Sequence, residues 1–348
     1  MSARSRLLAV AASAAGVAVA GTAVGVARRR HVIAHRGQGD ATPFGGLRSP
    51  PVTVVADDGV PLHVEVDECK RSPLTVVFVH GYALNLDCWH FQRAGYRGLV
   101  RAVYYDQRSH GRSGRSTEGR ASIEQLAADL LQVLDDVVPD GPVVLVGHSM
   151  GGMSIIALAE AHPEIFGDRV VGVGLISTTA GGLRPHRTLV PIFPSGLGSA
   201  LALRAVATLA RGHRAVDGVR RIGQAVASVV TDAFAFGDEV PASYVEFVDQ
   251  MLSATPFEVI AEFFPHFTSL DKFETVEALG AVPVSIICGT ADKLTAIGHS
   301  RKLQSRIPGS TLLECEGAGH MVLLERHEQV NAALDQLFAA AGERVDRR

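Results

Sequence analysis

The chain alternates short apolar runs with longer stretches of helical periodicity. Short runs rich in valine and isoleucine are typical of buried strands, and helical stretches between them predict a mostly parallel sheet covered by helices. The runs that predict core strands are residues 74–79, 143–146, 170–176, 282–289 and 310–315. Residues 52–55 and 62–66 flank Asp57-Asp58-Gly59 and predict an opening hairpin. The pattern as a whole predicts an α/β fold.

This alternation breaks between Leu183 and about Leu270. The segment has no valine-rich run, prolines divide its helical patterns, and it lies between two predicted core strands. We interpret it as an inserted helical cap. Its phenylalanines predict either an apolar lid over a substrate or packing of the cap against the core. They are Phe193, Phe234, Phe236, Phe247, Phe257, Phe263, Phe264 and Phe267.

The N-terminal residues 7–27 are uncharged, rich in alanine, valine and glycine, and long enough to span a bilayer. More arginines follow this stretch than precede it, which favours an uncleaved anchor with the rest of the chain in the cytoplasm. A cleaved export signal and a disordered leader are the alternatives. Residues 31–51 predict a linker that mechanically uncouples the anchor from the remaining chain.

The predicted organisation therefore has six parts. They are an anchor with its basic flank (1–36), a linker (37–51), a first core segment (52–182), the cap (183–270), a second core segment (271–341) and a charged tail (342–348). A chain of 348 residues suits one large α/β domain with an insertion.

Composition narrows the class of protein. A net charge of −3 gives no case for nucleic-acid binding. No phosphate-binding glycine loop or metal-ligand spacing stands out, so we expect no cofactor and no metal. Cys288 and Cys315 lie in predicted strands and are expected to be buried thiols. Cys69 and Cys88 could form a disulfide only in an exported protein.

The most informative motif is Gly147-His148-Ser149-Met150-Gly151. It follows the apolar run 143–146 and precedes a helical stretch over 152–162. Glycines on both sides allow a sharp reversal that holds the Ser149 hydroxyl exposed at the tip of a strand. The motif predicts a nucleophile elbow.

A serine hydroxyl needs a general base, and the base needs an orienting acid. Asp292 follows the predicted strand 282–289, and His320 follows the strand 310–315 on a loop that Gly317 and Gly319 predict to be flexible. The carboxyl ends of parallel strands meet at one edge of a sheet, which would bring these residues to Ser149. The loop after 170–176 carries no carboxylate, which leaves Asp292 as the acid.

An oxyanion would need two backbone N–H donors. Met150 follows the nucleophile, and Tyr82 follows the strand 74–79 in His80-Gly81-Tyr82. We expect both N–H groups to serve, with the Tyr82 ring either lining the pocket or simply packing. His80, Gly81, His148 and Tyr244 are the further residues expected to line a substrate pocket.

Together these motifs, with Asp106-Gln107-Arg108-Ser109-His110-Gly111-Arg112-Ser113, resemble the α/β-hydrolase superfamily. The resemblance covers about residues 52–338 and is greatest to bacterial non-haem haloperoxidase/esterase and C–C bond hydrolase branches. It implies the α/β-hydrolase fold, with structural ion pairs of Asp106 and Arg108. Ser109 departs from the usual glycine, which puts the local backbone conformation in question.

The nucleophile narrows the implied reaction. Epoxide hydrolases and haloalkane dehalogenases resemble this pattern but carry aspartate at the elbow. Ser149 instead implies a cofactor-free serine hydrolase that cleaves an ester, thioester or related acyl bond of a small, largely apolar substrate. Acyl transfer or perhydrolysis on the same triad, and a ligand-sensing module that keeps the fold, are the alternatives.

Overall fold

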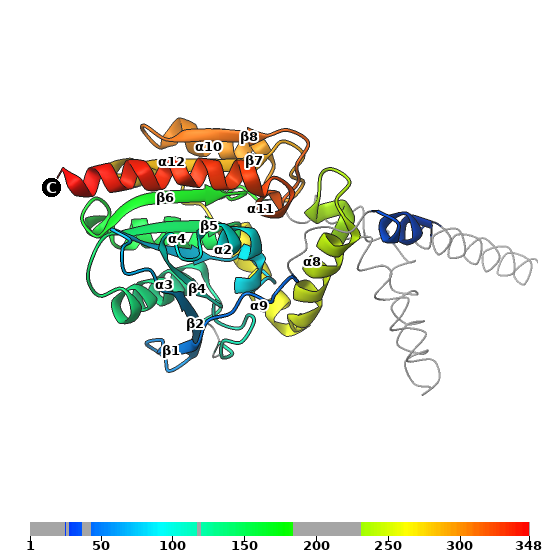
Figure 1. Cartoon of the computed structure of the whole chain (residues 1–348), viewed down its shortest axis with the longest axis horizontal. Helices are drawn as coiled ribbons and strands as arrows, with labels where there is room; N and C mark the ends of the chain where they lie inside the picture. The colour runs from blue at the N-terminus through cyan, green and yellow to red at the C-terminus, as the bar shows by residue number, and fades with distance from the viewer. Residues whose placement is uncertain (1–24, 26–27, 37–42, 117–119, 184–230, 348) are drawn as a thin grey trace, which may run out of the picture.

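The computed structural model describes residue 25 and residues 28–36, 43–116, 120–183 and 231–347. An eight-stranded sheet has the strand order β1-β2-β4-β3-β5-β6-β7-β8 (Figure 1). Strand β2 pairs antiparallel with β1 and β4, and every other pairing is parallel. The predicted α/β-hydrolase architecture, a mostly parallel sheet flanked by helices, is therefore confirmed.

The strands are β1 Pro51–Val55, β2 Pro61–Asp67, β3 Thr75–Val79, β4 Arg101–Tyr105, β5 Val143–His148, β6 Val170–Ile176, β7 Val284–Gly289 and β8 Thr311–Cys315. The α-helices are α2 His90–Tyr96, α3 Ile123–Val137, α4 Met150–Ala161, α8 Ala242–Ala254, α9 Phe257–Ser269, α10 Ile297–Arg306, α11 Val322–Glu325 and α12 His327–Asp346. Short 3-10 helices span Leu86–Trp89, Pro163–Ile165 and Val276–Ala281.

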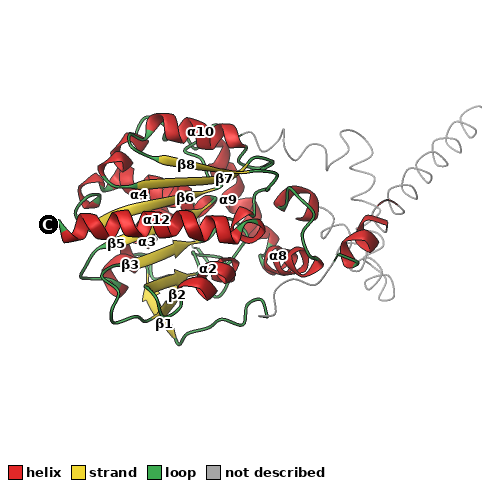
Figure 2. Cartoon of the chain, turned by 45° about the horizontal axis from the view of Figure 1, so that its top comes forward, coloured by secondary structure: helices red, strands yellow, loops and turns green. Residues whose placement is uncertain are grey.

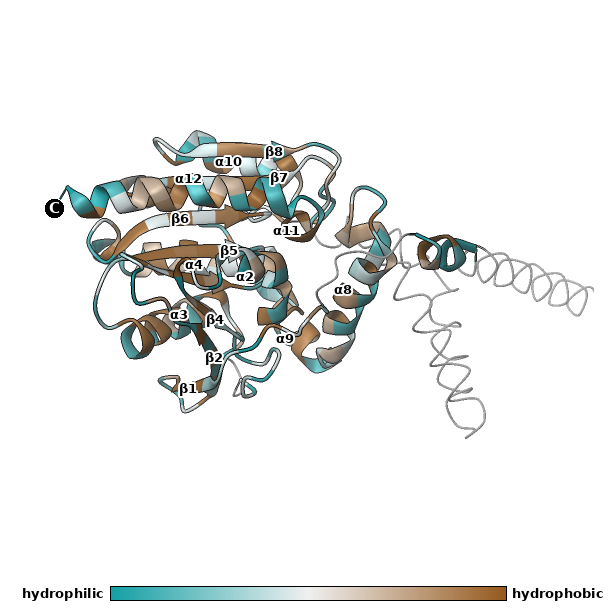
Figure 3. Ribbon diagram, in the orientation of Figure 1, coloured by the Kyte–Doolittle hydropathy of each residue, from teal (hydrophilic) through white to brown (hydrophobic). Residues whose placement is uncertain are grey.

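Helices cover both faces of the sheet, and α12 runs across one of them (Figure 2). The fully buried strand β5 shows why, because its successive side chains point to opposite faces. Val143 and Leu145 pack in the cluster that holds the buried residues of α3 and α4. Val144 and Val146 pack with α2 and α12 on the other face. The apolar colouring of β5 in Figure 3 reflects burial on both sides.

The predicted opening hairpin is confirmed as β1 and β2. Its turn depends on Gly59, whose φ of +85° is costly for any residue with a Cβ. The Gly59 N–H donates to the carbonyl of Ala56, and the Ala56 N–H donates to the carbonyl of Val60, both at 2.9 Å. Six of the seven β2 side chains are buried or half-buried, so the hairpin extends the core.

The described part of the predicted cap contains α8 and α9. Residues 184–230, including Phe193, lie outside the described residues. Phe236, Phe247, Phe263 and Phe267 are buried within the two hydrophobic clusters of the core. For these four rings the structure favours packing of the cap against the core over an apolar lid that faces substrate.

The segment before the hairpin is attached to the cap. Residues 28–34 are helical, and Arg29 and Arg36 both pair with the buried carboxylate of Asp232, at 2.9 and 2.6 Å. Further along, the ring of Phe44 stacks on that of Phe247 in α8, with centroids 4.5 Å apart. The expectation that residues 31–51 mechanically uncouple the leader from the domain is therefore wrong.

The predicted anchor, residues 7–27, lies outside the described residues except for Gly25, and it stays a prediction. Within the described ranges, no helix has the length and apolar character needed to cross a membrane.

All four cysteines are free thiols, so Cys69 and Cys88 form no disulfide. Cys88 is buried, and the Cys69 thiol points to the carbonyls of Gly98 and Leu99.

Candidate active site

Ser149 occupies a strained turn between β5 and α4. Its φ of +52° and ψ of −116° lie outside the regions that side chains ordinarily adopt. Neighbouring glycines make the turn possible. A Cβ at Gly147 would lie 2.6 Å from the backbone of Gly151, and one at Gly151 would lie 2.1 Å from the carbonyl oxygen of Val79. The motif therefore has glycine at the two positions where another backbone segment lies too close for a side chain.

Asp292 and His320 meet at the same edge of the sheet, after β7 and β8. Nδ1 of His320 lies 2.9 Å from Oδ2 of Asp292, and both residues are buried. Oδ1 of Asp292 accepts from the backbone N–H groups of Leu294 and Thr295, at 2.8 and 2.9 Å. Burial favours the neutral acid, but the charge and hydrogen bond of His320 and these N–H donors outweigh it and lower the pKa of Asp292 to about 2. Asp292 is therefore a carboxylate that orients His320.

The loop carrying His320 is held closely by the cap, which corrects the expectation of a flexible loop. A Cβ at Gly319 would lie 2.4 Å from the backbone nitrogen of Gly237. The N–H of Met321 donates to the carbonyl of Ala235 at 2.8 Å. The carboxylate of Glu325 accepts from the N–H groups of both Gly319 and Gly237. Glycine is needed at 319 for close approach between two chain segments.

His148 joins the serine turn to the histidine loop. Its Nε2 lies 3.0 Å from the carbonyl oxygen of His320, and because a carbonyl only accepts, Nε2 carries the proton. Burial, with His320 as a smaller cause, lowers the pKa of His148 to about 3, so its ring is neutral. The ring is fully buried. The structure thus places His148 as a link to His320 instead of on an open pocket wall.

The Ser149 hydroxyl makes no hydrogen bond to another residue in the described ranges. Ser149 is next to His148, whose ring centroid lies 4.9 Å from that of His320. The three predicted residues Ser149, Asp292 and His320 therefore converge on one edge of the sheet.

The loop after β3 lies directly against the nucleophile. A Cβ at Gly81 would lie 2.7 Å from Nδ1 of His148 and 3.2 Å from Cβ of Ser149, so only glycine fits there. Neither the Tyr82 nor the Met150 backbone N–H donates a hydrogen bond to any residue that the structure describes. Two donors beside the serine are therefore available to an incoming oxygen.

The Tyr82 side chain ties this loop to the cap. Its hydroxyl donates to the carbonyl of Ile260 in α9 at 2.5 Å, and its ring packs edge-on against Phe267 with centroids 4.8 Å apart. The Thr255 hydroxyl donates to the carbonyl of Ala83 at 3.1 Å. Of the two roles considered for the Tyr82 ring, packing is the one these contacts favour.

Two further residues expected to line the pocket have packing and hydrogen-bond partners of their own. His80 is fully buried, with Nδ1 bonded to the carbonyl of Gly81 and Nε2 accepting from the N–H of Gln107. Burial lowers the pKa of His80 to about 3, which keeps it a neutral link between two loops. Tyr244 has its ring contacts with Phe44 and Phe91, in an aromatic cluster between α8 and α2.

The residues after β4, from Asp106 onward, hold neighbouring loops together through buried ion pairs and hydrogen bonds. The fully buried Arg108 pairs with Asp58 and Asp129, which confirms the predicted ion pairing for this residue. Asp106 accepts from the N–H groups of Leu86 and Arg112. Ser109 keeps a positive φ of +66°, and its hydroxyl accepts from the N–H of Ser116 at 2.8 Å. Serine therefore adopts here the left-handed conformation that glycine adopts more cheaply.

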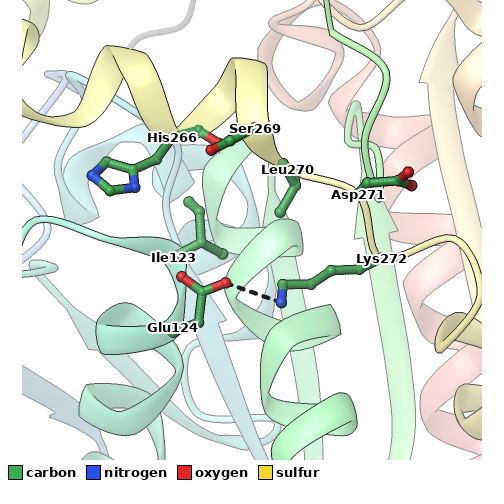
Figure 4. Close-up of a pocket in the computed structure, with 7 residues that line it drawn as sticks. All are labelled: Ile123, Glu124, His266, Ser269, Leu270, Asp271 and Lys272. Carbon is green, nitrogen blue, oxygen red and sulfur yellow. Dashed lines mark hydrogen bonds and ion pairs between the residues drawn. The ribbon is translucent and has the colours of Figure 1, made fainter.

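A small cavity of about 110 Å³ lies at the C-terminal end of α9 (Figure 4). Its lining residues are Ile123, Glu124, His266, Ser269, Leu270, Asp271 and Lys272. The Lys272 ammonium pairs with Glu124 at 3.0 Å and also with Glu160. None of the predicted site residues lines this cavity. It lies where the cap packs against the core.

One residue at the site is not among those that the sequence predicts. Thr295 is buried, and its Oγ1 lies 2.9 Å from Oδ2 of Asp292 and 3.3 Å from Nδ1 of His320. The available signal was a threonine three residues after the acid, since threonine hydroxyls often bond within such turns.

No group of three or more histidine, cysteine or acidic side chains in the described ranges is placed to hold a metal ion.

The fold and this edge of the sheet are those of an α/β-hydrolase. The model of the alpha/beta hydrolase family matches residues 76–333, well over half of the sequence, and the chain belongs to this family. An uncharacterized protein of Mycobacterium tuberculosis is 28% identical over 265 residues, covering 70% of this chain and 69% of that protein. A non-heme chloroperoxidase of Kitasatospora aureofaciens is 39% identical over 93 residues, covering 25% of this chain and 31% of that protein.

Among solved structures, a thermophilic esterase from Thermogutta terrifontis superposes with a TM-score of 0.64. It is 22% identical, with 84% of this chain and 100% of the esterase covered. A likeness at this identity shows the shared fold. Membership of the family supports a hydrolase-type activity for this chain.

Proposed function

We propose that the protein is a serine hydrolase that cleaves an ester, thioester or related acyl bond of a small, largely apolar substrate. The observation that carries the proposal is the buried Asp292–His320 pair beside the strained turn of Ser149. Nδ1 of His320 donates to Asp292, which leaves Nε2 free to accept the proton of Ser149.

The proposed reaction follows from these positions. Ser149 attacks the carbonyl carbon of the substrate, and His320 takes the serine proton and returns it to the leaving group. Asp292 fixes the imidazole and stabilises its charged form. The N–H groups of Tyr82 and Met150 stabilise the oxyanion, and water then releases the acyl group from Ser149.

A second proposal is perhydrolysis, in which hydrogen peroxide instead of water takes the acyl group from Ser149. The similarity of a 93-residue stretch to a chloroperoxidase favours considering it. Product analysis with and without added peroxide distinguishes the two, because only perhydrolysis yields a peracid.

The test combines labelling with turnover. A fluorophosphonate probe should label Ser149, and p-nitrophenyl esters of increasing acyl length should be hydrolysed. Ser149→Ala and His320→Ala should each lower turnover by about four to six orders of magnitude, and Asp292→Asn by somewhat less. Ser300→Ala, at a buried serine of α10, is the matched control and should leave turnover unchanged.

Two outcomes would reject the proposal. Wild-type turnover in a contaminant-free Ser149→Ala preparation would show that Ser149 is not the nucleophile. Absence of both labelling and turnover in the wild-type chain, with saturable binding of an apolar ester, would instead favour a ligand-sensing module.

A further inference from the structure

We propose that Thr295 is a positioning residue of this site, whose hydroxyl donates to Oδ2 of Asp292 and so limits how strongly that oxygen holds a proton on His320. The inference rests on the proposed function only in naming His320 as the general base. Its geometry stands independently.

The two oxygens of Asp292 have different partners. Oδ1 is occupied by the backbone N–H groups of Leu294 and Thr295. Oδ2 accepts hydrogen bonds from Nδ1 of His320 and from the hydroxyl of Thr295, each at 2.9 Å. Thr295 therefore contacts both oxygens, one through its backbone and one through its side chain, and fixes the plane of the carboxylate.

The hydroxyl of Thr295 has one proton and two possible acceptors. Oδ2 of Asp292 lies at 2.9 Å, and the carbonyl oxygen of Ser177 lies at 2.8 Å. A hydrogen bond to an ionised oxygen is roughly twice as strong as one between neutral groups, and Asp292 is ionised. The proton therefore goes to Oδ2, and the hydroxyl and His320 share the negative charge of that oxygen.

Other polar groups around the pair leave this arrangement intact. His148 at the end of β5 bonds the His320 carbonyl and is neutral. The Cys288 thiol of β7 lies 4.0 Å from Oδ2, and burial raises its pKa to about 12. On α10, burial lowers the pKa of His299. Glu325 of α11 bonds the N–H of Gly319.

Removing the hydroxyl has a defined direction. In Thr295→Val, Oδ2 loses the hydroxyl donor and keeps Nδ1 of His320 and the weak donor of the Cys288 thiol at 4.0 Å, so it stabilises the protonated imidazole more strongly. In the pH profile of kcat/KM, the rise on the acid side should move to higher pH by about half a unit. Looser alignment of His320 should also lower kcat/KM by about tenfold at pH values above this rise.

The experiment compares three variants of the full chain. Thr295→Ser retains the hydroxyl and should restore both the position of the rise on the acid side and the rate. Thr179→Val is the matched control, because this buried threonine bonds the carbonyl of Gly181 and contacts His299 without touching the triad. It should move neither quantity, even where it lowers the melting temperature.

A substrate-free readout separates this proposal from the proposed function. Titration of the His320 imidazole by NMR, assigned by its loss in His320→Gln, should show the same upward midpoint shift in Thr295→Val. An unchanged or lower midpoint would overturn the role of Thr295. A wild-type chain with no esterase activity but with this shift would reject the proposed function and leave the role of Thr295 standing.

Discussion

The buried ion cluster around Arg93 should make the fold strongly dependent on one side chain. Arg93 is 2% exposed and donates to both oxygens of Asp67, at 3.0 and 2.7 Å, and to Glu65 at 2.8 Å. Its guanidinium also lies 4.8 Å from the ring centre of Tyr104. Arg93→Met keeps most of the apolar stem but leaves two buried carboxylates without their main partner. Breaking such a pair costs about 3–5 kcal/mol, and we expect the upper part of that range.

The cost should also depend on pH. Burial would raise the pKa values of Glu65 and Asp67, but the hydrogen bonds of Arg93 and Ser49 and the charge of Arg93 outweigh it, so both lie below their usual values. The cluster thus stabilises the wild type above the unfolded-state values and loses this contribution as pH falls through the lowered folded values. In Arg93→Met the carboxyls are buried without the guanidinium. The difference between the two proteins should therefore shrink towards about pH 4.

Urea unfolding followed by circular dichroism, near neutral pH and at about pH 4, measures both quantities. Arg115→Met removes an exposed pair with Glu262 and should change stability by less than about 1 kcal/mol. An Arg93→Met penalty as small as that of Arg115→Met, or one equal at both pH values, would refute the reasoning.

Three other substitutions test features of the fold. Ser109→Ala and Ser109→Gly both lose the bond to Ser116, but only glycine relieves the positive φ, so the glycine variant should be more stable by about 1 kcal/mol in urea unfolding; equal stability would contradict this. Tyr82→Phe loses the bond to Ile260 and should cost about 1 kcal/mol and speed proteolysis within α9, whereas an unchanged cleavage rate would argue against the tie. A chain starting at Gly37 lacks Arg29 and Arg36, the partners of Asp232, and should be less stable by about 3 kcal/mol, with partial recovery in Asp232→Asn. Equal stability of the short and full chains would reject this role of the N-terminal helix.

The sequence was informative where local pattern determines position. Apolar runs mark β5, β7 and β8, and because the ends of parallel strands share an edge, the runs also predict that Ser149, Asp292 and His320 meet. The need for glycine in the serine turn could also be predicted from the sequence, since the spacing of these glycines reflects contacts within a few residues or with the adjacent strand.

What the sequence could not predict depends on contacts between distant segments. The sequence predicts flexibility at Gly319, but glycine is required there by the close approach of the Gly237 backbone. The sequence predicts a pocket-lining role for His148, but the hydrogen-bond partner of its ring is a carbonyl 172 positions away. Arg36 and Phe44 lie in a stretch with the composition of a linker, and only the folded cap supplies their partners, Asp232 and Phe247.

The bond between Tyr82 and Ile260 has a consequence for exchanging caps between members of the family. It spans 178 positions, with the donor side chain in the core and a backbone carbonyl as the acceptor. Any side chain at position 260 therefore preserves the acceptor, so a grafted α9 is free to vary in sequence. Its register is not free, because a one-residue slip turns the helix by about 100° and points a different carbonyl at the core. A chimera should be spliced to conserve the length of the chain up to α9 and its helical phase, with side chains chosen afterwards.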